Sequence, residues 1–325
     1  MENSKIIICL GIILIDMFPN RVGCKLADVT AFLPKPGGAP ANVAVALARR
    51  GIGSAFVGKV GADAFGDLLE NTLKEQGVFT GAMCRDEQAR TTLAFIARPD
   101  EHTAEFVFYR NPGADMRLCP EDLDEELFAR CSAFHFDSLS LTDEPAHAAT
   151  IRALELARKA GGLISFDVNY RPTLWRDPAE ALAQIEAMIA RVDLLKINEV
   201  ELKLLTGSDD PELAAPDLLK HGPRLVVVTL GARGSWYFIP GGCGFVPAFA
   251  VDTVDATGCG DAFISGVLGQ LVNTPGGWQS ALHSSVLEAY LKYSSAVGAL
   301  TAQTVGVIPA LPTADQVNQF IKSKA

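Results

Sequence analysis

The stretch VDATGCGDAF, from Val254 to Phe263, joins a glycine-rich loop to an acid at the start of a helix-like run. Glycine loops and helix N-termini present backbone N–H groups that can hold an anion such as a phosphate. Asp261 would then face the bound group. The alternative is that Asp261 only caps the helix, because aspartate is favoured there. Short glycine motifs also occur by chance, so this stretch alone leaves both interpretations open.

A second glycine-rich stretch, GGAPANVAVALARRG from Gly37 to Gly51, places Asn42 before an amphipathic helix. Glycines there let the backbone approach a ligand closely, although a simple helix start capped by asparagine is the alternative. Asp16 ends an apolar run, where an acid is costly unless it meets donors such as sugar hydroxyls. A turn-forming aspartate is the alternative, because Pro19 and Asn20 follow.

Two polar motifs follow predicted strands in the middle of the chain. SFDVNYRPTLW places Asp167, Asn169 and Arg171 in alternation, so that all three are expected on one face. NEVE places Asn198 and Glu201 three residues apart, and a helix would bring them to one side. A surface salt bridge is the alternative for Glu201.

A third motif after a predicted strand, TLGARG at residues 229–234, fits either the approach of a nucleotide or a plain hairpin turn. Each motif is weak by itself. However, ligands of parallel α/β sheets bind beyond the carboxyl ends of the strands, and these motifs follow strands. We therefore expect one shared site at that edge.

Apolar, β-rich runs alternate with helical patterns, which predicts a parallel sheet covered by helices on both faces. The expected strands are Lys5–Ile15, Ala55–Val60, Ala133–Asp137, Leu163–Val168, Asp193–Ile197 and Leu225–Leu230, and the expected helices include Ala41–Arg50, Phe65–Gln76, Ala146–Lys159 and Pro178–Ala190. Met17–Pro36 and Thr91–Arg110 are strand-like without intervening helices, and the second reads as a hairpin around Pro99–Thr103. A small antiparallel flap, of the kind that often acts as a lid, would explain both segments. Decorative insertions are the alternative.

Length and composition indicate a well-buried globular protein. The 325 residues suffice for one large α/β domain or two ordinary ones, and 49% are hydrophobic, with a mean hydropathy of +0.21. The net charge is -10 and no basic block stands out, which argues against nucleic-acid or membrane-surface binding as the main role. A cytoplasmic location is expected, because the seven scattered cysteines form no C-x-x-C pair and fit reduced thiols. The apolar run KIIICLGIILID is too short for a membrane helix and lacks a cleavage site, so we expect a buried strand.

In this order and spacing the motifs resemble the ribokinase-like, or phosphofructokinase-B type, carbohydrate kinases. The resemblance runs from LID at 14–16 to GVIPALP at 306–312, and Asp255 to Asp261 looks like the family's D-T-x-G-A-G-D signature. FYRNPGADM and FDVNYRPTLW look most like the fructokinases, while NYRPTLW also resembles the 2-keto-3-deoxygluconate kinases. The resemblance implies one catalytic domain over residues 1–325: a three-layer, doubly wound α/β fold with a mostly parallel sheet and a small β lid from about 17–36 and 91–110.

The implied activity is ATP-dependent phosphorylation of fructose to fructose 6-phosphate. A 2-keto-3-deoxygluconate kinase is the alternative within the class, and a catalytically weak sugar-binding relative is the alternative outside it. An acidic substrate would need a further cation, for which Lys35, Arg110 and Arg117 are candidates. The implied partners are a small sugar and a nucleotide, without nucleic acid or membrane. A homodimer is open, because exposed lid edges often pair.

The resemblance also gives roles to matched residues. The implied base is Asp261, and the groups on the transferring phosphoryl are Gly258, Cys259, Gly260 and Arg171. The implied sugar-binding residues are Asp16, Gly38, Asn42 and Asn169, with Tyr109 and Arg110 reaching down from the lid. The implied ATP-binding residues are Thr229, Gly231, Gly234 and Ser295. Mg²⁺ would be held through water by Asn198 and Glu201, and a monovalent cation such as K⁺ by Asp255 and the carbonyl of Thr257.

The chain departs from the family pattern at several positions that affect the sugar pocket and the choice of nucleotide. Ile12 stands where a glutamate is common, Ala256 and Cys259 replace the usual threonine and alanine, and Ser294-Ser295 replaces a frequent Ala-Asn.

An aspartate at a helix N-terminus is expected to have a low pKa and to be a weak base. Such a base suffices for a loose phosphoryl transition state, in which proton transfer comes late.

Overall fold

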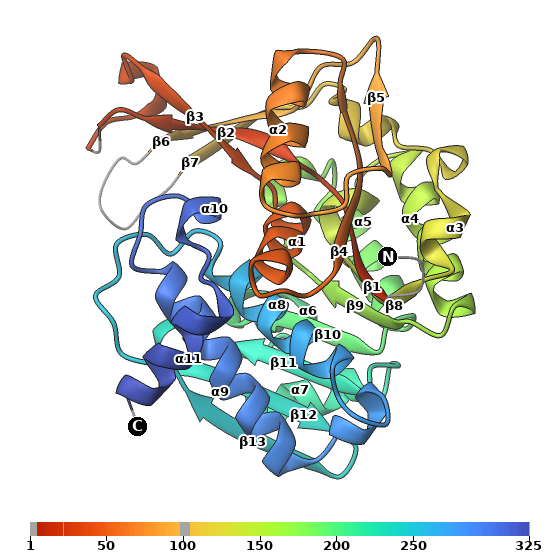
Figure 1. Ribbon diagram of the computed structural model, residues 1–325, viewed down its shortest axis with the longest axis vertical. Coiled ribbons are helices and arrows are strands. Elements are labelled where there is room, and N and C mark those ends of the chain that lie inside the picture. The colour runs from red at the N-terminus through yellow and green to blue at the C-terminus, as the bar shows by residue number, and fades with distance from the viewer. Residues whose placement is uncertain (1–4, 22, 98–104, 325) are drawn as a thin grey trace.

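The computed structural model describes residues 5–21, 23–97 and 105–324, whose strands form two sheets (Figure 1). The main sheet has the order β13-β12-β11-β10-β9-β8-β1-β4-β5, and the smaller one has the order β3-β2-β6-β7. The main-sheet strands are β1 (Ile6–Leu10), β4 (Ser54–Gly61), β5 (Met83–Asp86), β8 (Cys131–Asp137), β9 (Leu163–Asp167), β10 (Leu194–Asn198), β11 (Leu225–Thr229), β12 (Gly234–Ile239) and β13 (Gly242–Pro247). All pairings from β5 to β11 are parallel, and only β12 and β13 join antiparallel.

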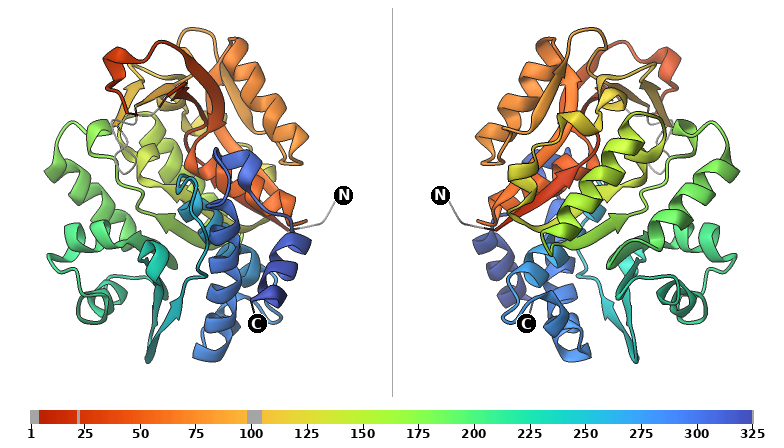
Figure 2. Two further views of the ribbon diagram at one scale, coloured as in Figure 1. Left: turned by 90° about the vertical axis from the view of Figure 1, so that its left-hand side faces the viewer. Right: turned by 90° about the vertical axis from the view of Figure 1, so that its right-hand side faces the viewer.

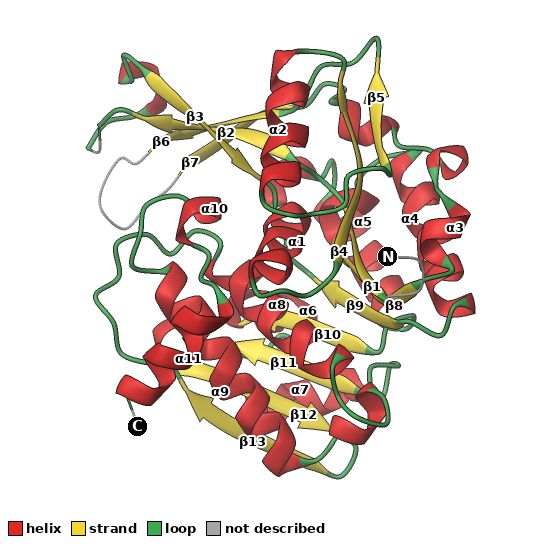
Figure 3. Cartoon of the chain, in the orientation of Figure 1, coloured by secondary structure: helices red, strands yellow, loops and turns green. Residues whose placement is uncertain are grey.

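Helices cover both faces of the main sheet, as Figures 2 and 3 show. One face packs against α1 (Ala39–Arg49), α2 (Ala64–Glu75), α8 (Cys259–Val272), α9 (Ser284–Thr301), α10 (Val307–Ala310) and α11 (Ala314–Ser323). The other packs against α3 (Glu125–Phe128), α4 (Ala146–Lys159), α5 (Pro178–Ile189), α6 (Glu199–Thr206) and α7 (Pro211–Leu219). Along β1, Ile6 and Ile8 belong to one core and Ile7 and Cys9 to the other. Most strand positions are apolar because both faces of the sheet are buried, which confirms the predicted three-layer α/β fold.

The expectation of a single strand over Lys5–Ile15 is wrong. β1 ends at Leu10, and the chain re-enters extended structure as β2 (Leu14–Pro19) in the smaller sheet. Gly11 has φ +153°, and a Cβ there would be 2.7 Å from Cγ of Pro40, so the chain leaves the main sheet at a glycine. Asp16 consequently lies within β2 and not at the end of a strand of the main sheet.

The smaller sheet, called the lid sheet below, consists of β2, β3 (Phe32–Gly37), β6 (Leu93–Ala97) and β7 (Glu105–Tyr109). It joins the two strand-like segments of the sequence analysis. The pairs β2–β3 and β6–β7 are antiparallel, but β2 and β6 are parallel, so the sheet is mixed. The expected hairpin tip around Pro99–Thr103 lies outside the described residues. In Figure 1 the lid sheet stands beside α2 and above α10.

The predicted helices agree closely with the structure. Residues 41–50, 65–76, 146–159 and 178–190 correspond to α1, α2, α4 and α5 with ends displaced by at most two residues. Within the described ranges no helix is long and apolar enough to cross a membrane.

Candidate active site

Asp261 lies in the first turn of α8, which begins after the glycine-rich loop. Gly258 precedes the helix with φ +76°, and a Cβ there would be 2.2 Å from Cγ1 of Val307, so a glycine is required. No side chain caps this helix, and one carboxylate oxygen of Asp261 instead accepts a hydrogen bond from Nδ2 of Asn42 at 2.8 Å. Asp261 thus lies in the first turn, as the capping interpretation requires, but its carboxylate is directed towards α1.

The environment of Asp261 gives its carboxyl an unusual acidity. Burial raises its pKa to about 7, and the nearby Asp167 carboxylate also raises it. The hydrogen bond from Asn42 and the charges of Lys196 and Arg171 act in the opposite direction. The expectation of a low pKa is therefore wrong, because desolvation outweighs the helix N-terminus. A pKa near neutrality suits a general base at neutral pH.

Asp16 lies on the lid sheet and shares this environment. Its pKa is raised to about 7 by burial, and then by the charges of Asp261 and Asp255. A Cβ on Gly37 would be 2.0 Å from Oδ2 of Asp16, so the glycine leaves room for this carboxylate. The Asp16 and Asp261 carboxyl groups thus belong to the same buried acidic region.

Asn42 and Gly38 complete this corner at the start of α1. Gly38 has φ +112°, and a Cβ there would be 2.3 Å from the carbonyl oxygen of Ile12. Asn42 is 4% exposed, and among the described residues its Oδ1 has no hydrogen-bond partner. A buried acceptor without a partner is costly, so this oxygen is suited to receive a ligand hydroxyl. The structure thus brings together Asp16, Asn42 and Asp261.

Tyr109 does not point towards this corner. Asp16 is paired with Ala94, and Ala94 with Phe108, so these three side chains share one face of the lid sheet. Tyr109 lies on the opposite face, where its ring centroid is 5.0 Å from that of Phe95, and it is 65% exposed. The expectation that Tyr109 reaches the sugar is therefore wrong for this conformation of the chain, because the alternation of a strand places it outside.

Arg110 is buried and bound to the protein itself. Its Nε donates to Oδ2 of Asp115 at 2.6 Å, and its Nη atoms donate to Thr142 Oγ1 and to the carbonyl oxygen of Leu139. We expected Arg110 to contact the substrate. In this structure it instead forms an ion pair with Asp115 that holds the segment after β7.

The segment after β9 departs from the expected alternation. Asn169 has φ +40°, a left-handed conformation that is uncommon outside glycine, and its Nδ2 donates to Asp137 Oδ2 at 2.9 Å. Both oxygens of Asp167 accept from Nζ of Lys196. Arg171 is exposed and donates to the carbonyl oxygen of Tyr170. The three predicted residues therefore lie close together in the chain but have different partners.

Asn198 and Glu201 form a capping box at the start of α6. The Asn198 side chain accepts from the Glu201 N–H, and Glu201 Oε2 accepts from the Asn198 N–H at 2.8 Å. Glu201 is 2% exposed and its Oε1 accepts from Tyr170 N, which excludes a surface salt bridge. These oxygens retain lone pairs for water, so they fit a Mg²⁺ held through its hydration shell. Within the described residues, no group of three or more His, Cys, Asp or Glu could bind a metal directly.

Asp255 organises the loop that precedes α8. One of its oxygens accepts from the N–H and Oγ1 of Thr257, and the other accepts from Gly306 N at 3.1 Å. The loop before α8 is thereby tied to the loop before α10.

The four residues expected to bind ATP share one cavity. Its volume is about 400 Å³, and its wall includes Thr229, Gly231, Gly234, Ser295, Cys259 and Gly260. Phe263 and Ala299 add apolar surface. Gly231 lies in the hairpin connection between β11 and β12 and Gly234 begins β12, so the hairpin and nucleotide interpretations of TLGARG are compatible.

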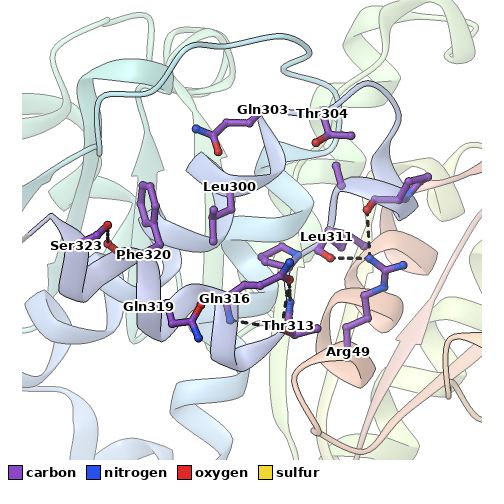
Figure 4. Close-up of a pocket in the computed structure, with 13 residues that line it drawn as sticks. Arg49, Leu300, Gln303, Thr304, Leu311, Thr313, Gln316, Gln319, Phe320 and Ser323 are labelled. Carbon is purple, nitrogen blue, oxygen red and sulfur yellow. Dashed lines mark hydrogen bonds between the residues drawn. The ribbon is translucent and has the colours of Figure 1, made fainter.

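A larger groove of about 850 Å³ lies elsewhere, between the end of α1 and the C-terminal helices (Figure 4). Arg49 donates to the carbonyl oxygen of Leu311 at 2.6 Å there and holds the segment after α10 onto α1. None of the predicted site residues lines this groove. We therefore place the candidate site at the smaller cavity, which is lined by the predicted ATP-binding residues and by the start of α8.

Two charged residues of this region were missed by the sequence analysis. Lys196 is buried on β10 and paired with Asp167, and Asp137 ends β8 beside Asn169. The available signal was a lysine inside the apolar strand LLKIN, since lysine is almost never buried without a partner.

Comparison with known proteins identifies the family. The model of the pfkB family of carbohydrate kinases matches residues 4–314. The chain belongs to this family. The kinase chain is 42% identical to fructokinase-1 of Oryza sativa subsp. japonica over 321 residues, which cover 98% of both proteins.

Solved structures of the same kind superpose closely on this pfkB kinase. Fructokinase from Xylella fastidiosa with bound ATP matches with a TM-score of 0.91 and 32% identity, covering 99% of both chains. A double mutant of fructokinase from Vibrio cholerae O395, bound to fructose, ADP and potassium ion, matches with a TM-score of 0.87 and 30% identity. That match covers 98% of this chain and 99% of the other.

Proposed function

We propose that the protein is an ATP-dependent fructokinase that converts fructose to fructose 6-phosphate. The observation that carries the proposal is the pairing of Asp261 with Asn42 at the start of α8, beside a cavity lined by Gly260 and Cys259. A carboxyl with a pKa of about 7 thus adjoins a glycine-rich helix start. Full-length similarity to fructokinases supports fructose as the acceptor.

In the proposed reaction, a fructose hydroxyl attacks the γ-phosphorus of ATP and the bond to the ADP oxygen breaks. Asp261 receives the hydroxyl proton, while Asp16 and the free Oδ1 of Asn42 orient the sugar. The amides of residues 258–260 face the transferring phosphoryl group, with Arg171 from the side open to solvent. Phosphoryl transfer depends mainly on positioning and charge neutralisation, which these groups supply.

The same proposal covers the ions, the assembly and the location. Mg²⁺ would neutralise phosphate charge and would be held through water by Asn198 and Glu201, which offer oxygen donors. A monovalent cation such as K⁺ would bind near Asp255 and the carbonyl of Thr257. Thr229, Gly231, Gly234 and Ser295 would hold ATP. The proposal also includes a cytoplasmic location and a homodimer formed through the edges of the lid sheet.

The alternative of a 2-keto-3-deoxygluconate kinase requires a cation for the substrate carboxylate. Two of the three candidates are occupied: Arg110 by Asp115, and Arg117, whose Nε donates to Asp86 at 2.7 Å. Nζ of Lys35 lies 4.9 Å from the centroid of the Phe18 ring. The commitment of both arginines to protein carboxylates favours a neutral sugar.

An ATP-coupled assay over a panel of sugars tests the substrate. We expect the highest kcat/KM with fructose, compared with ribose, adenosine and 2-keto-3-deoxygluconate. A higher kcat/KM with any of the other three would refute the fructokinase assignment while leaving the family unchanged.

A further inference from the structure

A buried lysine of the main sheet lies against the first turn of α8. Lys196 is 6% exposed, and its Nζ is 2.9 and 3.0 Å from the two oxygens of Asp167 on the neighbouring strand. A Cβ placed on Gly260 would be only 3.3 Å from the same Nζ. The ammonium group therefore lies between the Asp167 carboxylate and the backbone of Gly260, one residue before Asp261.

This location is unfavourable for a cation unless an anion is nearby. The N-terminus of a helix carries a partial positive charge, which repels an ammonium group at its first turn. Asp167 offsets this repulsion on the side of the sheet. On the other side, the ammonium and the N–H groups of α8 are two sources of positive charge that reinforce each other. A phosphoryl group at this helix start would be stabilised by both.

Acids outnumber cations around Lys196. The charged and titratable groups of this region come from several elements. The acids are Asp137 on β8, Asp167 on β9, Glu201 on α6, Asp261 on α8, Asp16 on β2 and Asp255 before α8. The bases besides Lys196 are His135 on β8 and Arg171 after β9. Burial lowers the pKa of His135 to about 4, so it is neutral at pH 7. Arg171 is exposed. Of the three basic side chains Lys196, His135 and Arg171, Lys196 is therefore the one that is both buried and positively charged at pH 7. Its charge lowers the pKa of Asp261, whereas that of Asp167 raises it.

We propose that Lys196 is a positioning residue for phosphoryl transfer: its ammonium, held by Asp167, supports Gly260 and places a fixed positive charge beneath the cradle of residues 258–260. This rests on the proposed function, since it assigns to that reaction a residue that contacts neither substrate directly. The competing explanation is that Lys196 only neutralises Asp167 in the core.

The test compares Lys196→Met, the double variant Lys196→Met/Asp167→Asn, and Lys59→Met as a matched control. Lys59 is also buried on a strand of the main sheet, where it pairs with Asp122 at 2.6 Å, and neither of these residues lines the smaller cavity. Each variant is checked for folding by its unfolding temperature. Steady-state kinetics with ATP and fructose then give kcat, both KM values, and the acidic limb of kcat/KM against pH.

For Lys196→Met we expect kcat to fall by about tenfold or more, with both KM values within about threefold of the parent. The acidic limb should move to higher pH, because removing the cation raises the pKa of Asp261. The double variant separates the two explanations. It removes one charge that lowers this pKa and one that raises it, so the limb should return towards the parent. Its kcat should stay low, because the cation beneath Gly260 is still missing.

A double variant with parental kcat would overturn the proposal and leave Lys196 with a purely structural role. A folded Lys196→Met enzyme with the parental kcat and the parental acidic limb would also overturn the proposal. An equal loss of kcat in Lys59→Met would do the same. The proposed function fails separately, if the parent phosphorylates no sugar. Calorimetry with a non-hydrolysable ATP analogue then still decides the inference: Lys196→Met should bind it about threefold more weakly and Lys59→Met should not. Equal binding by all three proteins would overturn it.

Discussion

Replacing Asp261 by asparagine should make the protein less active and more stable. Asparagine keeps the size of the side chain and an oxygen that can accept from Asn42, but it cannot take a proton. General-base loss of this kind typically lowers kcat by roughly 10²- to 10⁴-fold, while fructose binding changes little.

The stability change follows from the raised pKa. A rise from 3.8 to about 7 means that the folded state holds this proton far more tightly than the unfolded chain. The ionised carboxylate therefore opposes folding above pH 7, by up to about 4 kcal/mol as an order of magnitude. The free energy of unfolding of the parent protein therefore falls as the pH rises from about 4 to 7. Asp261→Asn removes this loss, so its advantage should be larger at pH 8 than at pH 5 by about 3 kcal/mol.

Urea unfolding of parent and variant at the two pH values measures this difference. Asp63→Asn serves as a control of opposite sign. The Asp63 carboxylate caps α2 by accepting from Gly66 N, and these hydrogen bonds lower its pKa despite partial burial. A group with a lowered pKa stabilises the fold at pH values above its unfolded pKa, so this variant should lose stability at pH 8. A pH-independent stability difference for Asp261→Asn, or a kcat close to the parent, would refute the reasoning.

Two further predictions concern the lid sheet and the cation. Hydrogen exchange in 17–36 and 91–110 should slow on adding fructose, because the lid sheet carries Asp16 and would close over the sugar to exclude water; unchanged protection at saturating fructose would show that the sheet is not a lid. Activity should rise in K⁺ relative to a bulky organic cation at matched ionic strength, because the loop of Asp255 and Thr257 would bind it; equal rates would remove the site.

The sequence by itself determined the alternation of strands and helices and the position of the glycine-rich loop before α8. These features follow from local physics: strands buried on both faces are mostly apolar, helices show their own periodicity, and a left-handed backbone such as that of Gly258 favours glycine. The same local signals also singled out Asp261, Asn42 and part of the wall of the smaller cavity, whereas Ser295 was assigned only through the family resemblance.

Only the tertiary structure decided how those residues can act. Asn42 and Asp261 are 219 residues apart in the chain, and their contact depends on α1 packing beside α8. The pKa of Asp261 depends on burial and on distant charges, which reversed the expectation drawn from the helix N-terminus alone. The outward direction of Tyr109 and the burial of Lys196 likewise depend on strand pairing. Desolvation and long-range charge are properties of the packed molecule, so no local pattern specifies them.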